Sequence, residues 1–118
     1  MSHGWIAVDL DGTLAKYEGW KGVGHIGEPV PAMVDRVRRW LAEGKQVKIF
    51  TARVATRNER ELEEAIMAIR AWCVKHIGVA LPITCTKDFG MIHLYDDRCT
   101  AVEPNTGRLI GVDEDSHA

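Results

Sequence analysis

The chain has 118 residues, a formal net charge of −2 at pH 7 and a mean hydropathy of −0.15. This length suits a single hydrophobic core, so we expect residues 1–118 to form one domain. The small net charge excludes the global basic field of a protein that coats nucleic acid or a membrane surface, and no apolar stretch approaches the roughly 18 residues of a membrane span.

The first predicted strand delivers two carboxylates to one place. The apolar run 6–8 leads to Asp9 and Asp11, and Gly12 then breaks the strand. Residues i and i+2 of an extended strand project to the same side, so both carboxylates can reach one point beyond its carboxyl end. Two acids this close repel unless a proton or a cation lies between them. Mg²⁺ is the expected cation, because it prefers oxygen ligands and is usually held by one or two carboxylates together with substrate phosphates.

A polar, glycine-rich segment and two helices are predicted next. We expect residues 15–28 to form a flap, whose G-x-G-x-x-G pattern does not follow a strand and so predicts no dinucleotide site. Helical spacing of apolar residues predicts a helix over 31–43, opened by prolines and ended by a glycine, and a longer helix over 58–76. The expected buried stripes are Val34, Val37 and Leu41 in the first helix, and Leu62, Ile66, Ile69 and Cys73 in the second.

Three further strand-like runs, 46–50, 83–86 and 91–95, alternate with or follow the helices, and polar residues stand at the end of each run. This alternation predicts a parallel sheet with right-handed crossovers and helices on both faces. Such sheets bind ligands in the crevice outside the carboxyl ends of their strands. The polar residues that reach this edge are Thr51-Ala52-Arg53, Lys87-Asp88 and Asp96-Asp97.

The last part of the chain predicts a hairpin and a loose end. Short runs at 101–103 and 108–111 flank a Pro-Asn-Thr-Gly turn, and the tail at 113–118 is expected to fray. The three cysteines of the chain are odd in number and lack a C-x-x-C spacing, which favours free thiols in a reducing cytoplasm and argues against zinc. Cys85 lacks the arginine six positions later that a cysteine-dependent phosphatase loop requires, so we expect it to pack beside the site.

The ordered set Asp9-Leu10-Asp11-Gly12-Thr13, Thr51, Lys87 and Asp96-Asp97 resembles the four motifs of the haloacid dehalogenase superfamily, and it covers most of residues 5–100. The nearest likeness is to small, capless, phage-type and bacterial members. The resemblance implies a Rossmann-like three-layer α/β/α sandwich with a mainly parallel central sheet. Because the flap and the 51–87 segment leave no room for an inserted domain, we expect a core without a cap.

The resemblance also implies a role for each motif residue. Asp9 is expected to attack phosphorus and to bind Mg²⁺, and Asp11 to exchange protons with the leaving group and water while its backbone carbonyl binds the metal. Thr51 and Lys87 are expected to hold the phosphate, although a helix-capping Thr51 and a solvated Lys87 are the structural alternatives. The implied metal ligands are Asp9, Asp11, Asp96 and Asp97. Of the last two, Asp96 is expected to bind the metal directly. The implied substrate-binding residues are Gly12, Thr13, Ala52 and Arg53.

A site without a cap is open, and the flap or a neighbouring subunit of a homo-oligomer is then needed to cover it. Such a cleft suits a nucleotide, a nucleic-acid end or another large phosphorylated substrate. Trp20, Lys21 and His25 of the flap are candidates for contact with the leaving group, although loop side chains of this kind are more often partly packed. Arg53, Arg57 and Arg60 are candidates for a second phosphate, with a solvated helix start as the alternative.

The sequence therefore predicts a magnesium-dependent phosphatase that hydrolyses a phosphomonoester through an aspartyl-phosphate. A phosphorylation-switched signalling module is the alternative, because receiver domains also gather acids, a threonine and a lysine at strand ends. The order of the motifs argues against it, since here the third run ends in Lys87 and the second acidic pair follows the fourth run. A binding protein without turnover is disfavoured by the complete set of acids.

Overall fold

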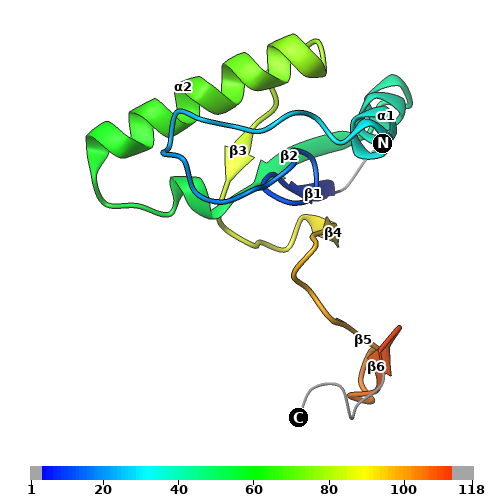
Figure 1. The fold of residues 1–118 in the computed structure, drawn as a ribbon. Coiled ribbons are helices and arrows are strands. Elements are labelled where there is room, and N and C mark those ends of the chain that lie inside the picture. The colour runs from blue at the N-terminus through cyan, green and yellow to red at the C-terminus, as the bar shows by residue number, and fades with distance from the viewer. Residues whose placement is uncertain (1–3, 113–118) are drawn as a thin grey trace.

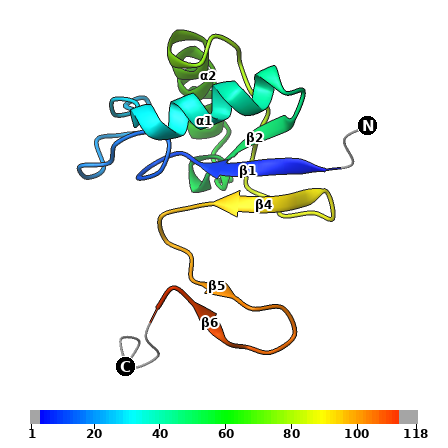
Figure 2. The same cartoon turned by 90° about the vertical axis from the view of Figure 1, so that its right-hand side faces the viewer.

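A computed structural model describes residues 4–112, and Figures 1 and 2 show its fold. Two helices and one 3₁₀ turn are connected to short strands in an α/β arrangement. The helical elements are α1 (Pro31–Ala42), η1 (Ala52–Val54) and α2 (Glu59–His76). The strands are β1 (Trp5–Asp9), β2 (Gln46–Phe50), β3 (Ile83–Thr84), β4 (Met91–Tyr95), β5 (Ala101–Val102) and β6 (Leu109–Ile110).

The first four strands form a parallel sheet in the order β3-β2-β1-β4. The predicted α/β fold with a parallel sheet is therefore confirmed. β1 lies inside the sheet, with Asp9 paired in register with Phe50 of β2 and Val8 with Tyr95 of β4. Since all four strands run in the same direction, the ends of β1, β2 and β4 bring the residues that follow them to one edge.

Both helices pack on the same face of the sheet. Ile6 and Val8 of β1 share one buried cluster with Val37 of α1 and with Ile69 of α2. The chain steps from β1 to β2 to β3 in one direction across the sheet, and two crossovers of the same hand place their helices on one face.

We expected helices on both faces, but within residues 4–112 no helix covers the second face. The link that returns from β3 to β4, residues 85–90, is too short for one. Leu94 and Ile92 of β4 point to this uncovered face, because Leu94 is in register with Ala7 and not with Val8, which faces the helices. Ile92 is accordingly 59% exposed.

Local sequence explains the helix boundaries. Pro31 begins α1, and the Asn58 side chain caps α2 by accepting a hydrogen bond from Glu61 N at 3.0 Å. Gly44 and Gly78 follow the helices with φ of +81° and +104°. The buried stripe of α2 differs from the predicted one, since Ile69 and Cys73 are buried as expected, together with Ala65 and Trp72, while Leu62 and Ile66 are half-buried.

The flap is closed at its base by backbone hydrogen bonds. Lys16 N donates to Glu28 O and Val30 N to Leu14 O, each at 2.8 Å, and the Trp72 indole of α2 donates to Gly27 O at 2.9 Å. Residues 16–28 thus leave and re-enter the core at one point and form a compact loop with ends that meet.

The predicted C-terminal hairpin is confirmed as the antiparallel pair β5 and β6, which both figures show set apart from the sheet. The predicted fraying at 113–118 concerns residues outside the described range. In the part of the chain that is described, neither helix combines the length and hydrophobicity that a bilayer crossing requires.

Candidate functional site

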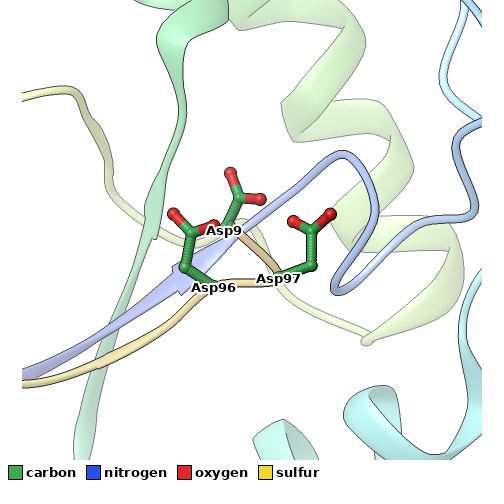
Figure 3. Close-up of side chains that lie close together, drawn as sticks. All are labelled: Asp9, Asp96 and Asp97. Carbon is green, nitrogen blue, oxygen red and sulfur yellow. The ribbon is translucent and has the colours of Figure 1, made fainter. Parts of the chain in front are cut away.

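Three carboxylates meet at the carboxyl edge of the sheet. Asp9 ends β1, and Asp96 and Asp97 follow directly after the neighbouring strand β4. One oxygen from each carboxylate lies within 4.8 Å of the others, and Figure 3 shows the three groups gathered at this edge. The parallel pairing of β1 and β4 produces this meeting, because it aligns the ends of both strands. The three oxygen donors have the chemistry that a hard divalent cation prefers.

The pKa of Asp9 is raised by its position in this cluster. Burial, which is the largest cause, together with the nearby charges of Asp96 and Asp97 raises the pKa of Asp9 from 3.8 to about 7. A hydrogen bond with the Asp97 side chain raises this pKa further, and one from the Leu10 backbone opposes the rise. Without a cation, Asp9 therefore keeps its proton up to a pH well above that at which carboxyl groups normally ionise.

The loop after β1 ties the two acidic segments together through Thr13. The Thr13 hydroxyl donates to Asp97 Oδ1 at 3.2 Å, lies 3.5 Å from Asp9 Oδ2 and accepts from Asp97 N at 2.9 Å. Gly12 beside it has φ of +90°, and a Cβ atom there would lie 2.8 Å from Asp97 Cγ. The glycine is thus required both by the turn and by the close approach of the Asp97 carboxylate.

Asp11 points away from this trio toward Arg53. The Arg53 Nε donates to Asp11 Oδ2 at 2.8 Å and Nη2 to Oδ1 at 2.9 Å, a two-pronged ion pair. The same guanidinium donates to three flap carbonyls, those of Gly22 at 3.4 Å, Val23 at 3.0 Å and His25 at 2.8 Å. A guanidinium has five N–H donors, so protein acceptors occupy all of them here.

Arg53 was predicted to bind substrate. The structure shows it buried, in contact with both the flap and Asp11, and it also lines the cleft over the acids, so substrate binding stays a prediction. Arg57 and Arg60 are exposed at the start of α2. Lys21 and His25 line a smaller pocket of about 220 Å³ between the flap and Arg53, separate from the three-carboxylate cluster.

Thr51 has the capping role that was one of its two predicted roles, and it also stands at the cleft. It is 3% exposed and caps η1, because its hydroxyl oxygen accepts a hydrogen bond from Arg53 N at 3.1 Å. It also lines the cleft that holds Asp9. A hydroxyl oxygen can accept from the backbone while its hydrogen donates to a ligand, so the cap does not exclude contact with a phosphate.

The cleft over the acids has a volume of about 560 Å³ and contains residues from the flap, η1 and both acidic segments. Cys85 lines it, as predicted, and so does Ala52. Lys87 does not: it is exposed in the link between β3 and β4. The full lining is Asp9, Asp11, Tyr17, Trp20, Phe50, Thr51, Ala52, Arg53, Ala55, Cys85, Asp96, Asp97 and Arg98.

Sequence reasoning did not single out Arg98 and Tyr17. Arg98 brings a positive charge to the cleft directly after the acidic pair, and its backbone N–H donates to Asp96 Oδ1 at 2.8 Å. Its position next to Asp97 was the available signal. Tyr17 lies in the flap, where no periodic pattern distinguishes a residue that faces the site from one that faces water.

Comparison with known proteins adds information on the fold only. No protein-family model and no curated protein matches this sequence. Among solved structures, a conserved protein from Bacteroides thetaiotaomicron is similar with a TM-score of 0.53 and 23% sequence identity, over 80% of this chain and 75% of that protein. A likeness at this identity supports the α/β fold, and the functional argument therefore rests on the residues of the site.

Proposed function

We propose that this chain is a magnesium-dependent phosphatase that hydrolyses a phosphomonoester through an aspartyl-phosphate, as a member of the haloacid dehalogenase superfamily. The observation that carries the proposal is the meeting of Asp9, Asp96 and Asp97 at the strand ends. The substrate is a nucleotide, a nucleic-acid end or another phosphate ester that fits an open cleft. Exposed thiols at Cys85 and Cys99 agree with a reducing cytoplasm as the compartment.

The donor set fits a divalent cation. Asp9, Asp96 and Asp97 would hold it, and the backbone carbonyl of Asp11 belongs to the same proposed set. A positive charge at this point would oppose the effects of burial and of the neighbouring carboxylates, which together raise the pKa of Asp9. When bound, Mg²⁺ would supply positive charge to the phosphoryl oxygens and so lower the barrier to attack by an anion.

The proposed reaction has two steps, and the chain supplies the groups for both. An Asp9 oxygen attacks phosphorus, the bond from phosphorus to the ester oxygen breaks, and the departing oxygen takes a proton from Asp11. Water then attacks the aspartyl-phosphate and gives its proton to Asp11, which releases inorganic phosphate and restores the Asp9 carboxylate. Thr51 and Arg98 line the cleft where the phosphoryl oxygens would lie.

The geometry of Asp11 sets a condition on these steps. Both of its oxygens accept hydrogen bonds from Arg53, so neither is directed at a leaving group. For Asp11 to donate a proton, its carboxylate must first take one up from solvent, and one of these two contacts must be exchanged for a contact to the ester oxygen. A rotation of the Asp11 carboxyl group away from Arg53 is the motion that this role requires.

The test is phosphate release from phenyl phosphate with and without Mg²⁺. We expect Asp9→Asn to abolish turnover, because the amide keeps the shape of the side chain but loses the charge needed for attack and for metal binding. Asp35→Asn, on the exposed side of α1, is the matched control and should keep full activity. Activity of Asp9→Asn within tenfold of wild type would exclude Asp9 as the nucleophile.

The lifetime of the intermediate separates an enzyme from a switch. Acid-quenched protein, examined by mass spectrometry after reaction, should carry phosphate on Asp9 only transiently. A phosphorylated protein that persists for minutes without release of phosphate would favour the signalling alternative.

A further inference from the structure

The flap presents a large aromatic side chain to the cleft that holds the acids. Trp20 lines this cleft together with Asp9 and Asp96, and yet 57% of its surface remains exposed. Tyr17, from the same flap, also lines the cleft and is 43% exposed. Two exposed aromatic rings from one flap at the same cleft offer a surface on which a flat apolar group can stack.

The Trp20 ring is held in place by the residue that organises the site. The Arg53 guanidinium carbon lies 4.8 Å from the centre of the ring, in a cation–π contact. Arg53 is fixed in turn by its contacts with Asp11 and the flap carbonyls. A stacking surface that is held in position before the ligand arrives costs little conformational entropy on binding.

One guanidinium group contacts both the Trp20 ring and the Asp11 carboxylate. Trp20 and the three acids line the same cleft. A nucleotide joins an aromatic base to its phosphate through a sugar, so its phosphate could lie at the acids while its base lies on the flap.

We propose that the substrate is a terminal nucleotide, with its phosphate at Asp9 and its base stacked on Trp20. This inference rests on the proposed phosphatase function and adds the class of leaving group. The cleft volume of about 560 Å³ lies within the range of roughly 300–1,000 Å³ that is typical of small-molecule sites. The nucleotide can be free or can stand at the end of an oligonucleotide, since the chemistry recognised is the same.

The test compares adenosine 5′-monophosphate with ribose 5-phosphate, which has the same sugar phosphate without the base. We expect wild type to prefer the nucleotide in kcat/KM. Because a base gains affinity by stacking on an aromatic side chain, Trp20→Ala should lower this preference by about tenfold. Trp20→Phe should retain most of it, and Met67→Ala, an exposed apolar change on α2, should not alter it.

Two results would overturn the inference. One is equal kcat/KM for both substrates in wild type, and the other is a loss in Trp20→Ala that is the same for both, which would indicate a general loosening of the flap. A 5′-phosphorylated oligonucleotide forms the second arm of the panel. A higher kcat/KM for the oligonucleotide than for the free nucleotide would identify the end of a nucleic-acid strand as the substrate. A lower kcat/KM would identify the free nucleotide as the substrate.

Binding to Asp9→Asn, measured by calorimetry in the presence of Mg²⁺, distinguishes failure of this inference from failure of the proposed function. If no ester is hydrolysed by wild type but the nucleotide binds more tightly than ribose 5-phosphate, and Trp20→Ala removes the difference, the phosphatase function fails and the stacking site stands. If esters are hydrolysed and binding does not depend on the base, the phosphatase stands and the stacking site fails. Absence of both hydrolysis and nucleotide binding refutes both.

Discussion

Both carboxylate oxygens of Asp11 accept hydrogen bonds from Arg53, at 2.8 and 2.9 Å, and the same guanidinium holds the flap through three backbone carbonyls. One buried cation thus links the second motif acid to the loop that covers the site. These contacts hold the flap in one position and the carboxylate in one orientation.

Replacement of Arg53 should therefore destabilise the protein as well as impair activity. Removal of one partner of a buried ion pair, together with the loss of donors to three carbonyls, typically costs about 2–4 kcal/mol. We expect Arg53→Ala to lower the free energy of unfolding by this amount in urea denaturation. Arg53→Lys should recover only part of the loss, because an ammonium group cannot reproduce the planar fork.

The exposed Arg57 is the control, and Arg57→Ala should change the free energy of unfolding by less than about 0.5 kcal/mol. Trypsin should also cleave Arg53→Ala faster than wild type at Lys16 and Lys21, which lie in the flap that Arg53 holds. Equal unfolding energies and equal cleavage rates for wild type and Arg53→Ala would show that the guanidinium does not hold the flap in solution.

Gly12 is predicted to be the glycine whose substitution damages the metal cluster. Gly12 and Gly19 both have positive φ, of +90° and +109°, but only a Cβ atom at Gly12 would collide with Asp97, since nothing lies within 4 Å at Gly19. We expect Gly19→Ala to cost about 1–2 kcal/mol from backbone strain alone. Gly12→Ala should cost more, and it should also displace the Asp97 carboxylate. Calorimetric titration with Mg²⁺ should show weaker binding to Gly12→Ala only, and equal binding to both variants would contradict this expectation.

The acids of the site could be predicted from sequence because their positions follow from short-range rules. Asp9, Asp96 and Asp97 stand at the ends of strands, and parallel pairing fixes where strand ends meet. The partner of Asp11 could not be predicted in this way. Arg53 of η1 contacts Asp11 directly while the flap carbonyls of residues 22–25 hold the same guanidinium, and a glycine-rich loop has no periodic pattern from which its path can be inferred.

Two other differences between expectation and structure concern the short link from β3 to β4. The second helical layer depended on the link from β3 to β4, and its few residues leave Ile92 uncovered and Lys87 outside the cleft. The role of Lys87 therefore remains a prediction from the motif order. The sequence prediction considered the polarity of this link but not its length, which leaves no room for a helix on the second face.

The effect of Mg²⁺ on stability should increase with pH. The raised pKa of Asp9, about 7 against an ordinary value of 3.8, means that the folded metal-free protein holds this proton more tightly than the unfolded chain does. The contribution of this proton to the free energy of unfolding is therefore present at acidic pH and is lost as the pH rises through about 7. A cation that binds Asp9 must displace the proton, so acid weakens binding.

We therefore expect the Mg²⁺-induced rise in melting temperature to be larger at pH 8 than at pH 5.5, by differential scanning fluorimetry. Without metal, Asp9→Asn should melt at a higher temperature than wild type at pH 8, and this difference should shrink toward pH 4. A Mg²⁺ effect that is equal at both pH values would mean that Asp9 is not a ligand.

The two acids after β4 should contribute unequally to metal binding. Asp96 is partly buried and exerts a stronger charge effect on Asp9 than Asp97 does, whereas Asp97 is exposed and is engaged by Thr13. We expect Asp96→Ala to weaken Mg²⁺ binding more than Asp97→Ala, in calorimetric titration. The exposed Asp35→Ala serves as the control, and the reverse order of the two acids would exchange their roles.

Asp11→Asn should distinguish a proton donor from a purely structural carboxylate. The amide oxygen can still accept one hydrogen bond from Arg53, so the flap should stay closed, but the side chain cannot supply a proton to the leaving oxygen. Good leaving groups need little protonation, and poor ones need it in the transition state. The variant should therefore hydrolyse phenyl phosphate much more slowly than wild type while it retains more of its activity on p-nitrophenyl phosphate.

Comparison of kcat/KM for the two esters provides the measurement, and Arg53→Lys is a useful companion because it disturbs the same contact without removing the acid. Equal losses on both esters in Asp11→Asn would place Asp11 in the support of the flap, and the proton of the leaving group would then have to come from water or from another residue of the cleft.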